Sequence, residues 1–256
     1  MITGIDHIVV VVPQLEPAKS SYTRLGFTVV AGGSHPAYGS RNALVAFADR
    51  SYIELIAFEN PALKHPWAEK LTTGGGLIDF CLRTSDLRAD VQAFRGAGID
   101  ISDPTPLTRT RPDGYLLKWV LAIPARDCGI VPFLIEDETP RDERVPRQSE
   151  HRNGVLAIAA LTVALDSLDR IGAFYSRVLT AEPNRIDRPD LEASGLSFSV
   201  GSSALELVAS NRDQGPVADW IRSRGSSPFA ARFKSASATP FALEPSLTAG
   251  AQFSIG

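Results

Sequence analysis

Apolar and polar positions along the chain recur in blocks of the same order. The first block opens with an apolar, β-branched run at residues 8–12, which is typical of a strand covered on both faces, and Pro13 lacks the backbone donor that would continue it. Tyr22 and Leu25 then follow at helical spacing, and Gly26 can supply the left-handed cap that ends a helix. The pattern therefore predicts a strand followed by a helix.

Three more apolar segments complete this block, at residues 27–30, 42–47 and 51–57. They predict three strands, so the whole block has the order βαβββ. His7 and Glu54 stand in otherwise apolar strands of this block. Burial of an imidazole or a carboxylate costs free energy unless a metal ion or a hydrogen-bond partner offsets the lost hydration. The two residues are therefore candidate ligands.

The same order returns twice further along the chain, and Tyr175 and Glu206 of the third copy align with Tyr22 and Glu54. The second copy predicts a helix at residues 87–96 and strands at residues 77–84, 99–101, 115–123 and 130–135. The third copy predicts a helix at residues 167–179 and strands at residues 157–165 and 204–208. The tail predicts only two strands, at residues 229–233 and 251–255.

These copies predict a division of the chain into two halves. Residues 1–138 are expected to form a domain of two paired modules, at 1–60 and 75–138. Residues 139–153 are rich in charge and proline and are expected to be a linker. Residues 154–256 are expected to hold the third module and a reduced fourth one.

Composition narrows the classes of partner. With 44% hydrophobic residues, 21% charged residues and a net charge of −3 over 256 residues, the chain is expected to fold around a core and has no basic stripe for nucleic acid. Two cysteines are too few for a disulfide scaffold, and no apolar run is long enough to cross a membrane. We expect a cytoplasmic protein with a small-molecule substrate, without nucleic-acid or membrane partners, and a homodimer is a further expectation.

Paired βαβββ units with a histidine on the first strand and a glutamate on the last resemble the vicinal oxygen chelate (VOC) superfamily. The chain is similar to the glyoxalase-like branch of that superfamily, and two sets of residues carry the likeness. The first set lies at residues 32–36, 39–44 and 52–55. The second set lies at residues 67–68, 74–77, 109, 111–114, 119 and 132–135.

The resemblance implies an α+β fold in which repeated βαβββ modules form curled, mostly antiparallel sheets. It also implies a divalent metal ion (Zn, Mn, Ni, Fe or Mg) that chelates two neighbouring oxygens of a substrate. Carried over by position, the metal ligands are His7, Glu54 and Asp79, the last in place of the usual histidine. The alternative for Asp79 is a hydrogen bond to a loop amide. The fourth ligand position falls on Phe133, and Ala160 takes the His7 position in the third copy.

Further candidates for the site follow from the chemistry of individual residues. His35, in a glycine-rich loop between strands, is a candidate catalytic base, and the alternative is that turn geometry alone explains the neighbouring glycines. Asn42 is a candidate substrate-binding residue. Arg109, Arg111 and Trp119 are also candidate substrate-binding residues, since arginine can bind an anionic group and tryptophan can line an apolar pocket. The alternative for these three is a plain hairpin turn with exposed arginines and a core tryptophan.

The leading functional interpretation is a metal-dependent enzyme of isomerase, lyase or dioxygenase type that acts on a small oxygen-rich substrate. Glu54 would then be a metal ligand or the catalytic base. The alternative is a metal-free protein of the bleomycin-resistance type that binds and sequesters a small molecule, with His7 and Glu54 joined only by a buried hydrogen bond. Metal content separates these two interpretations.

Overall fold

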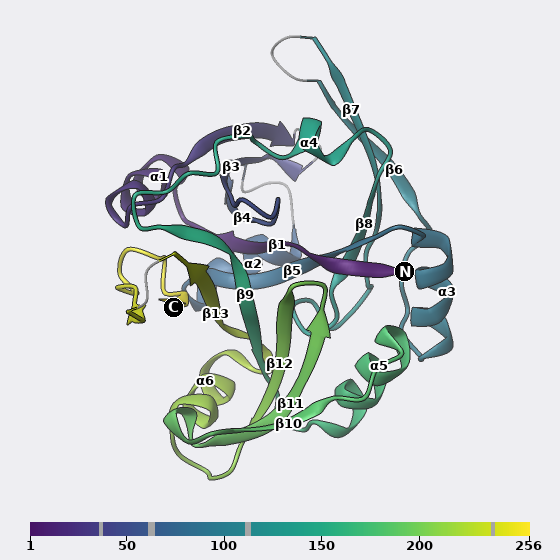
Figure 1. Cartoon of the computed structure of the whole chain (residues 1–256), viewed down its shortest axis with the longest axis vertical. Helices are drawn as coiled ribbons and strands as arrows, with labels where there is room; N and C mark the ends of the chain where they lie inside the picture. Colours follow the sequence, from purple (N-terminus) through teal and green to yellow (C-terminus); the bar gives the residue numbers. More distant parts are fainter. Residues whose placement is uncertain (36–37, 61–64, 111–113, 237–238) are drawn as a thin grey trace. The chain divides into compact units, whose positions relative to one another are not determined.

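The computed structural model describes residues 1–35, 38–60, 65–110, 114–236 and 239–256, and the first block has the predicted βαβββ order (Figure 1). Its elements are β1 (Ile2–Val11), α1 (Leu15–Arg24), β2 (Val30–His35), β3 (Ser40–Ala46) and β4 (Tyr52–Phe58). α1 buries Leu15, Ala18 and Tyr22, which recur at helical spacing. Gly26 follows the helix with a φ of 89°, a left-handed conformation in which glycine carries no steric penalty.

The second block begins after a short helical segment formed by α2 (Pro66–Glu69) and the 3-10 helix η2 (Lys70–Thr73). Its elements are β5 (Gly76–Thr84), α3 (Leu87–Gly96), β6 (Thr105–Thr110), β7 (Leu116–Ala122) and β8 (Phe133–Asp137). The strand predicted at residues 99–101 is wrong, because Ile101 forms only an isolated bridge with Pro124. Pro104 has no backbone N–H to donate, and the strand starts after it.

The third block repeats the order with β9 (Val155–Ala164), α5 (Asp169–Leu179), β10 (Asn184–Arg188), η3 (Pro189–Leu191), β11 (Ala193–Val200) and β12 (Ser203–Ser210). The tail contains α6 (Pro216–Arg224), β13 (Ser227–Ser235), β14 (Phe241–Ala242) and β15 (Gln252–Ile255). Strand register confirms the internal alignment. His7 is opposite Tyr52 in β1 and β4, and Ala160 is opposite Ala204 in β9 and β12.

The strands form two mostly antiparallel sheets, so the predicted α+β class is confirmed. One sheet has the order β2-β3-β4-β1-β5-β8-β7-β6, and the other has the order β10-β11-β12-β9-β13-β15-β14. The parallel pairs join the first and last strands of a block, as in β1 with β4 and β5 with β8. Such pairs need a crossover, which the helix and the two intervening strands provide.

The described residues group into two compact units, each assembled from segments that are distant in sequence. Unit 1 comprises residues 1–6, 79–139 and 160–229, and unit 2 comprises residues 7–78, 140–159 and 230–256. In unit 1, Phe94 of α3 packs edge to face against Phe174 of α5, with ring centroids 5.0 Å apart. In unit 2, three aromatic rings pack together with centroids 5.5 to 6.5 Å apart, those of Phe27, Phe47 and Phe233. The domain bounds expected from the sequence stay a prediction.

Residues 140–153 of the predicted linker belong to unit 2. They contain α4 (Arg141–Arg144), whose Arg144 donates a hydrogen bond to the hydroxyl of Tyr52 on β4. Val145 directly after the helix joins a buried apolar cluster with residues of β3 and β4, namely Leu44, Ala46 and Tyr52. This segment therefore covers the sheet face that carries the even-numbered residues of β3 and β4.

Candidate functional site

His7 and Glu54 meet on one face of the unit 2 sheet. In the parallel pair of β1 and β4, His7 is opposite Tyr52 and Val9 is opposite Glu54. Partners in register point to the same face and side chains alternate, so His7 and Glu54 share a face and lie one pair apart. Their Nε2 and Oε2 atoms are 3.5 Å apart, and the residues are only 4% and 8% exposed. The expected proximity is found, while the metal-binding role stays a prediction.

Asn42 connects the carboxylate to the glycine-rich segment. Its Nδ2 donates to Glu54 Oε1 at 2.6 Å, and its Oδ1 accepts from the backbone N–H of Gly33 at 2.7 Å. A Cβ on Gly32 would lie 2.0 Å from Asn42 Oδ1, so only glycine leaves room for this amide. The contacts fix which oxygen of Glu54 faces His7. They place Asn42 beside His7 and Glu54, and its contact with a substrate stays a prediction.

Tyr52 and Arg144 complete the contacts on this face. The Tyr52 ring stacks on the imidazole of His7 with centroids 4.5 Å apart and planes inclined by 15°. Arg144 Nη1 donates to the Tyr52 hydroxyl at 3.0 Å, and both residues are buried. The sequence did not single out either residue for the site. Pairing β1 with β4 places Tyr52 opposite His7, so this register could have identified Tyr52 from the sequence. Arg144 is one of several charged residues in the predicted linker, and no local sequence pattern distinguishes it from the others.

His35 lies at the end of β2 rather than in a loop, after a bulge between Ala31 and Ser34. It pairs with Ser40, which puts it on the same face as Asn42, and its Nδ1 is 3.2 Å from Ser40 Oγ. Burial lowers the pKa of His65, and its electrostatic interaction with nearby His35 lowers it further. His35 thus lies on the candidate face, and its role as a base stays a prediction.

Asp79 lies in unit 1, where its carboxylate holds a loop. Oδ1 accepts from the backbone N–H groups of Phe80 and Gly129 at 2.8 and 3.2 Å, and the Sγ of Cys128 lies 3.0 Å from Oδ2. Tyr175 donates from its hydroxyl to the carbonyl of Ile130 at 2.7 Å in the same loop. These contacts favour a structural role, and the metal-ligand role of Asp79 stays a prediction.

Arg109 and Trp119 also lie in unit 1, on the β6–β7 hairpin. Arg109 is opposite Leu117 and Trp119 is opposite Leu107, so both residues point to one face of the hairpin. Phe133 lies on the same face through the pairing of β7 with β8. Arg111 lies outside the described residues. The roles of Arg109, Arg111 and Trp119 in substrate binding stay predictions.

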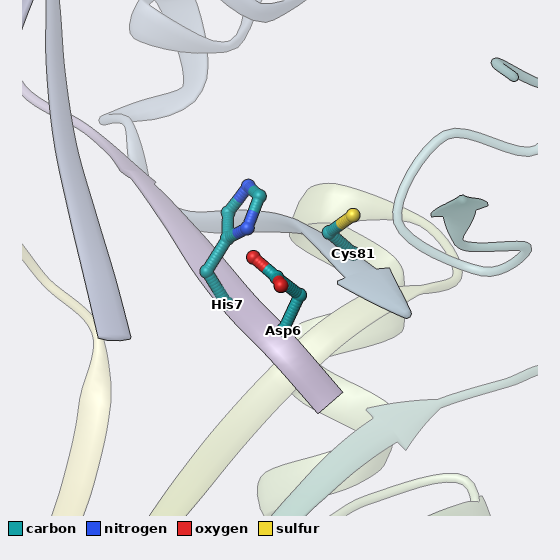
Figure 2. A group of neighbouring side chains, drawn as sticks. All are labelled: Asp6, His7 and Cys81. Carbon is teal, nitrogen blue, oxygen red and sulfur yellow. The ribbon is translucent and has the colours of Figure 1, made fainter. Parts of the chain in front are cut away.

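His7 also belongs to a second buried group, which Figure 2 shows. One ligand atom from each of Asp6, His7 and Cys81 lies within 4.8 Å of the others. Thiolate, imidazole and carboxylate are all metal ligands.

The third block provides an internal comparison, with the carboxylate of Glu206 at the place of Glu54. Arg188, which matches His35 in strand register, donates from Nη1 to Glu206 Oε2 at 2.7 Å, and Thr162 donates to the same oxygen at 3.0 Å. The pKa of Arg188 is raised by its hydrogen bond with Asp190 and by the charge of Glu206. The positive charge of Arg188 therefore compensates the carboxylate of Glu206 within the third block. Asn42, by contrast, gives Glu54 a neutral donor.

A family model described as a glyoxalase-like domain matches residues 5–179, more than half of the chain. The chain belongs to the glyoxalase-like domain family. The match covers the first two blocks and extends through α5 in the third. The matched range includes His7, Asn42, Glu54 and Asp79. It also includes Tyr52 and Arg144.

Solved structures confirm the fold of this glyoxalase-like protein. A hypothetical protein from Staphylococcus aureus matches with a TM-score of 0.73 and 17% identity, over 98% of each chain. A mutant of 4-hydroxymandelate synthase from Streptomyces coelicolor matches with a TM-score of 0.64 and 17% identity, over 91% of this chain and 71% of that one. The glyoxalase-like protein therefore has the VOC fold, as the sequence indicated.

A fusion protein of a xylose isomerase-like TIM barrel and 4-hydroxyphenylpyruvate dioxygenase also matches, with a TM-score of 0.54 and 17% identity, over 93% of this chain and 37% of that one. Among curated proteins, the comparison finds no sequence that matches this chain. Within the described part of the chain, each helix lacks the length or apolar character needed to cross a membrane.

Proposed function

We propose that this glyoxalase-like protein is a metal-dependent enzyme that acts on a small molecule with two adjacent oxygens, and that His7 and Glu54 hold its divalent ion. The observation that carries the proposal is the spacing of 3.5 Å between His7 Nε2 and Glu54 Oε2 in a buried environment. Dioxygenase-type proteins share the fold, and the family match covers the residues concerned.

The spacing supports a ligand pair over a simple hydrogen bond. A good hydrogen bond between a ring N–H and a carboxylate spans about 2.7–3.2 Å, which is shorter than the observed separation. Two ligands at about 2.0–2.2 Å from one tetrahedral ion lie roughly 3.3–3.5 Å apart, by the geometry of metal–ligand bonds. Imidazole nitrogen and carboxylate oxygen are both suited to Zn, Mn, Ni, Fe and Mg sites to different degrees. The donor pair therefore fits a metal.

Each side chain around the pair has a definable task. Asn42 holds Glu54 Oε1 and leaves Oε2 directed at His7. His35, on the same face, is available to accept a proton from a substrate carbon or hydroxyl. When bound, a divalent ion would polarise adjacent substrate oxygens and stabilise negative charge that develops on them. Isomerase, lyase and dioxygenase reactions all use this property.

A metal-free binding protein is the second candidate, and a specific observation favours it. In the second block the position that corresponds to Glu54 holds Phe133, which is buried, and the position of His7 holds Asp79, whose carboxylate binds Phe80, Cys128 and Gly129. At these two positions the second block therefore has a carboxylate that already binds a loop and a phenyl ring without donor atoms, where the first block has an imidazole and a carboxylate. A sequestering protein needs no such pair.

Metal binding by variants tests the proposal. We expect the purified protein to bind about one equivalent of divalent metal, and His7→Ala or Glu54→Gln to lose it, since each substitution removes a ligand. Glu206→Gln is the matched control, because it makes the same change at the same register position of the third block. Wild-type protein that binds no metal with micromolar affinity or better would favour the sequestering function instead. Metal retained by both ligand variants would exclude this pair as the site.

A further inference from the structure

We infer that Tyr52, held by Arg144, is a positioning residue that fixes the imidazole of His7 for metal binding. The inference rests on the proposed function and extends it to a residue of the predicted linker. The contacts run from Arg144 to the Tyr52 hydroxyl, from the Tyr52 ring to the His7 ring, and from His7 to Glu54. All four residues belong to unit 2.

The stacking geometry restricts the orientation of the imidazole. The rings of His7 and Tyr52 are nearly parallel, with an inclination of 15° and a centroid separation of 4.5 Å. Rotation of the His7 side chain about its χ2 bond would turn the ring out of this stack and move Nε2 away from Glu54. Ligands whose orientation is fixed before binding lose less conformational freedom when the ion arrives. The ring of Tyr52 therefore acts on affinity without contact with the ion.

Arg144 fixes the tyrosine in turn. Its Nη1 donates to the Tyr52 hydroxyl at 3.0 Å, and its guanidinium carbon is 5.9 Å from the ring centroid. Val145, the next residue, packs in the apolar cluster with Leu44 and Ala46, so the backbone that carries Arg144 is anchored to the sheet. The predicted linker thereby supplies part of the site.

The third block gives independent support, because it lacks both members of the stack together. The pair of His7 opposite Tyr52 becomes Ala160 opposite Ala204 in the same register. Gly195 occupies the position that corresponds to Asn42, since it is paired with Val208 as Asn42 is with Ile56. Where the imidazole is absent, the tyrosine ring and the amide are absent too. Their presence in the first block is thus tied to the histidine rather than to the sheet.

Two measurements on four variants test the inference. The first is metal affinity, and the second is the order parameter of the His7 ring from NMR relaxation in the metal-free protein. We expect Tyr52→Leu to weaken metal binding by about 10- to 100-fold, the range for residues that orient a ligand. We expect Tyr52→Phe and Arg144→Gln each to weaken metal binding less, by about three- to tenfold. The double variant should have the same metal affinity as either single variant, because all three lose the same hydrogen bond. Each should also lower the His7 order parameter.

Tyr175→Phe is the matched control, because it removes the hydroxyl of another buried tyrosine that donates to the carbonyl of Ile130 in unit 1. It should leave metal affinity and His7 order unchanged. If folded Tyr52→Leu protein keeps wild-type metal affinity and a rigid His7 ring, the inference is wrong and the proposed function stands. If wild-type protein binds no metal, the proposed function fails, and the His7 order parameter still decides whether Tyr52 positions the ring.

Discussion

The side-chain amide of Asn42 donates a 2.6 Å hydrogen bond to Glu54, and the same side chain accepts a bond from the backbone of Gly33. One residue thus satisfies a buried carboxylate and ties it to the neighbouring strand. The amide is neutral, so this bond places no positive charge beside the carboxylate. This pair provides a direct test of the site.

Asn42→Ala should lower both stability and metal affinity. The substitution leaves Glu54 Oε1 and the Gly33 N–H without this partner, which typically costs about 1–3 kcal/mol of unfolding free energy. Denaturant unfolding measures the first effect and metal titration the second. Asn211→Ala is the control, because the bond between Ser194 and Asn211 is solvent-exposed and its loss should change stability by at most about 0.5 kcal/mol. Equal effects of the two substitutions would contradict the role of Asn42.

Gly32→Ala should displace the Asn42 side chain. A Cβ at position 32 would lie 2.0 Å from Asn42 Oδ1 and 2.9 Å from its backbone oxygen, so either the side chain or β2 must move. Overpacking of this kind costs about 1–3 kcal/mol, and we expect metal affinity to fall with it. Gly96→Ala is the control, since its Cβ would meet only Arg177 at an ordinary 3.5 Å on helix α3. That variant should be neutral or slightly more stable, and thermal unfolding compares the two.

Stability should decrease as pH falls through the range in which histidine titrates, in part because of His151. Its Nδ1 accepts from the backbone N–H of Thr28 at 3.0 Å, and its Nε2 is 3.0 Å from the carbonyl oxygen of Ala46. Burial lowers the pKa of His151, and the contact with Ala46 offsets this only in part. The unfolded chain then binds the proton more readily, so unfolding free energy is lost below about pH 6.5. His65, whose pKa is also lowered, contributes in the same direction.

His151→Asn isolates this contribution, because the asparagine oxygen can still accept from Thr28 but does not titrate. Unfolding by denaturant between about pH 7 and pH 5 should show a smaller loss of stability in the variant than in the wild type. His65→Gln should reduce the loss separately. Identical pH dependence in wild type and His151→Asn would show that His151 is not a source of acid sensitivity.

Asp79→Ala should open the loop at Cys128 while metal binding persists. The carboxylate accepts from Gly129 and lies against Cys128 Sγ, so its removal should expose the thiol and lower stability by about 1–3 kcal/mol. The rate of Cys128 alkylation measures the exposure, and Cys81→Ala in the same background removes the other thiol from the signal. Loss of metal from folded Asp79→Ala protein would instead support Asp79 as a ligand.

Local sequence patterns determined the elements and the first pair of candidates. Strand and helix periods are set by a few neighbouring residues, so α3, β4 and β7 were predicted close to their observed ranges. His7 and Glu54 stood out because polar groups in apolar strands are costly wherever the strand is buried. The internal alignment also held, since Ala160 and Ala204 occupy the register positions of His7 and Tyr52.

Tertiary structure alone decided which side chains surround that pair. The register of β1 against β4 stacks Tyr52 on His7, and the return of residues 140–159 to unit 2 brings Arg144 to the same face. Likewise, Asp79 finds its partners in a loop about fifty residues later. The register between strands and the packing of residues 140–159 on unit 2 depend on contacts between segments that are distant in sequence. Local hydrophobic periodicity does not encode such contacts.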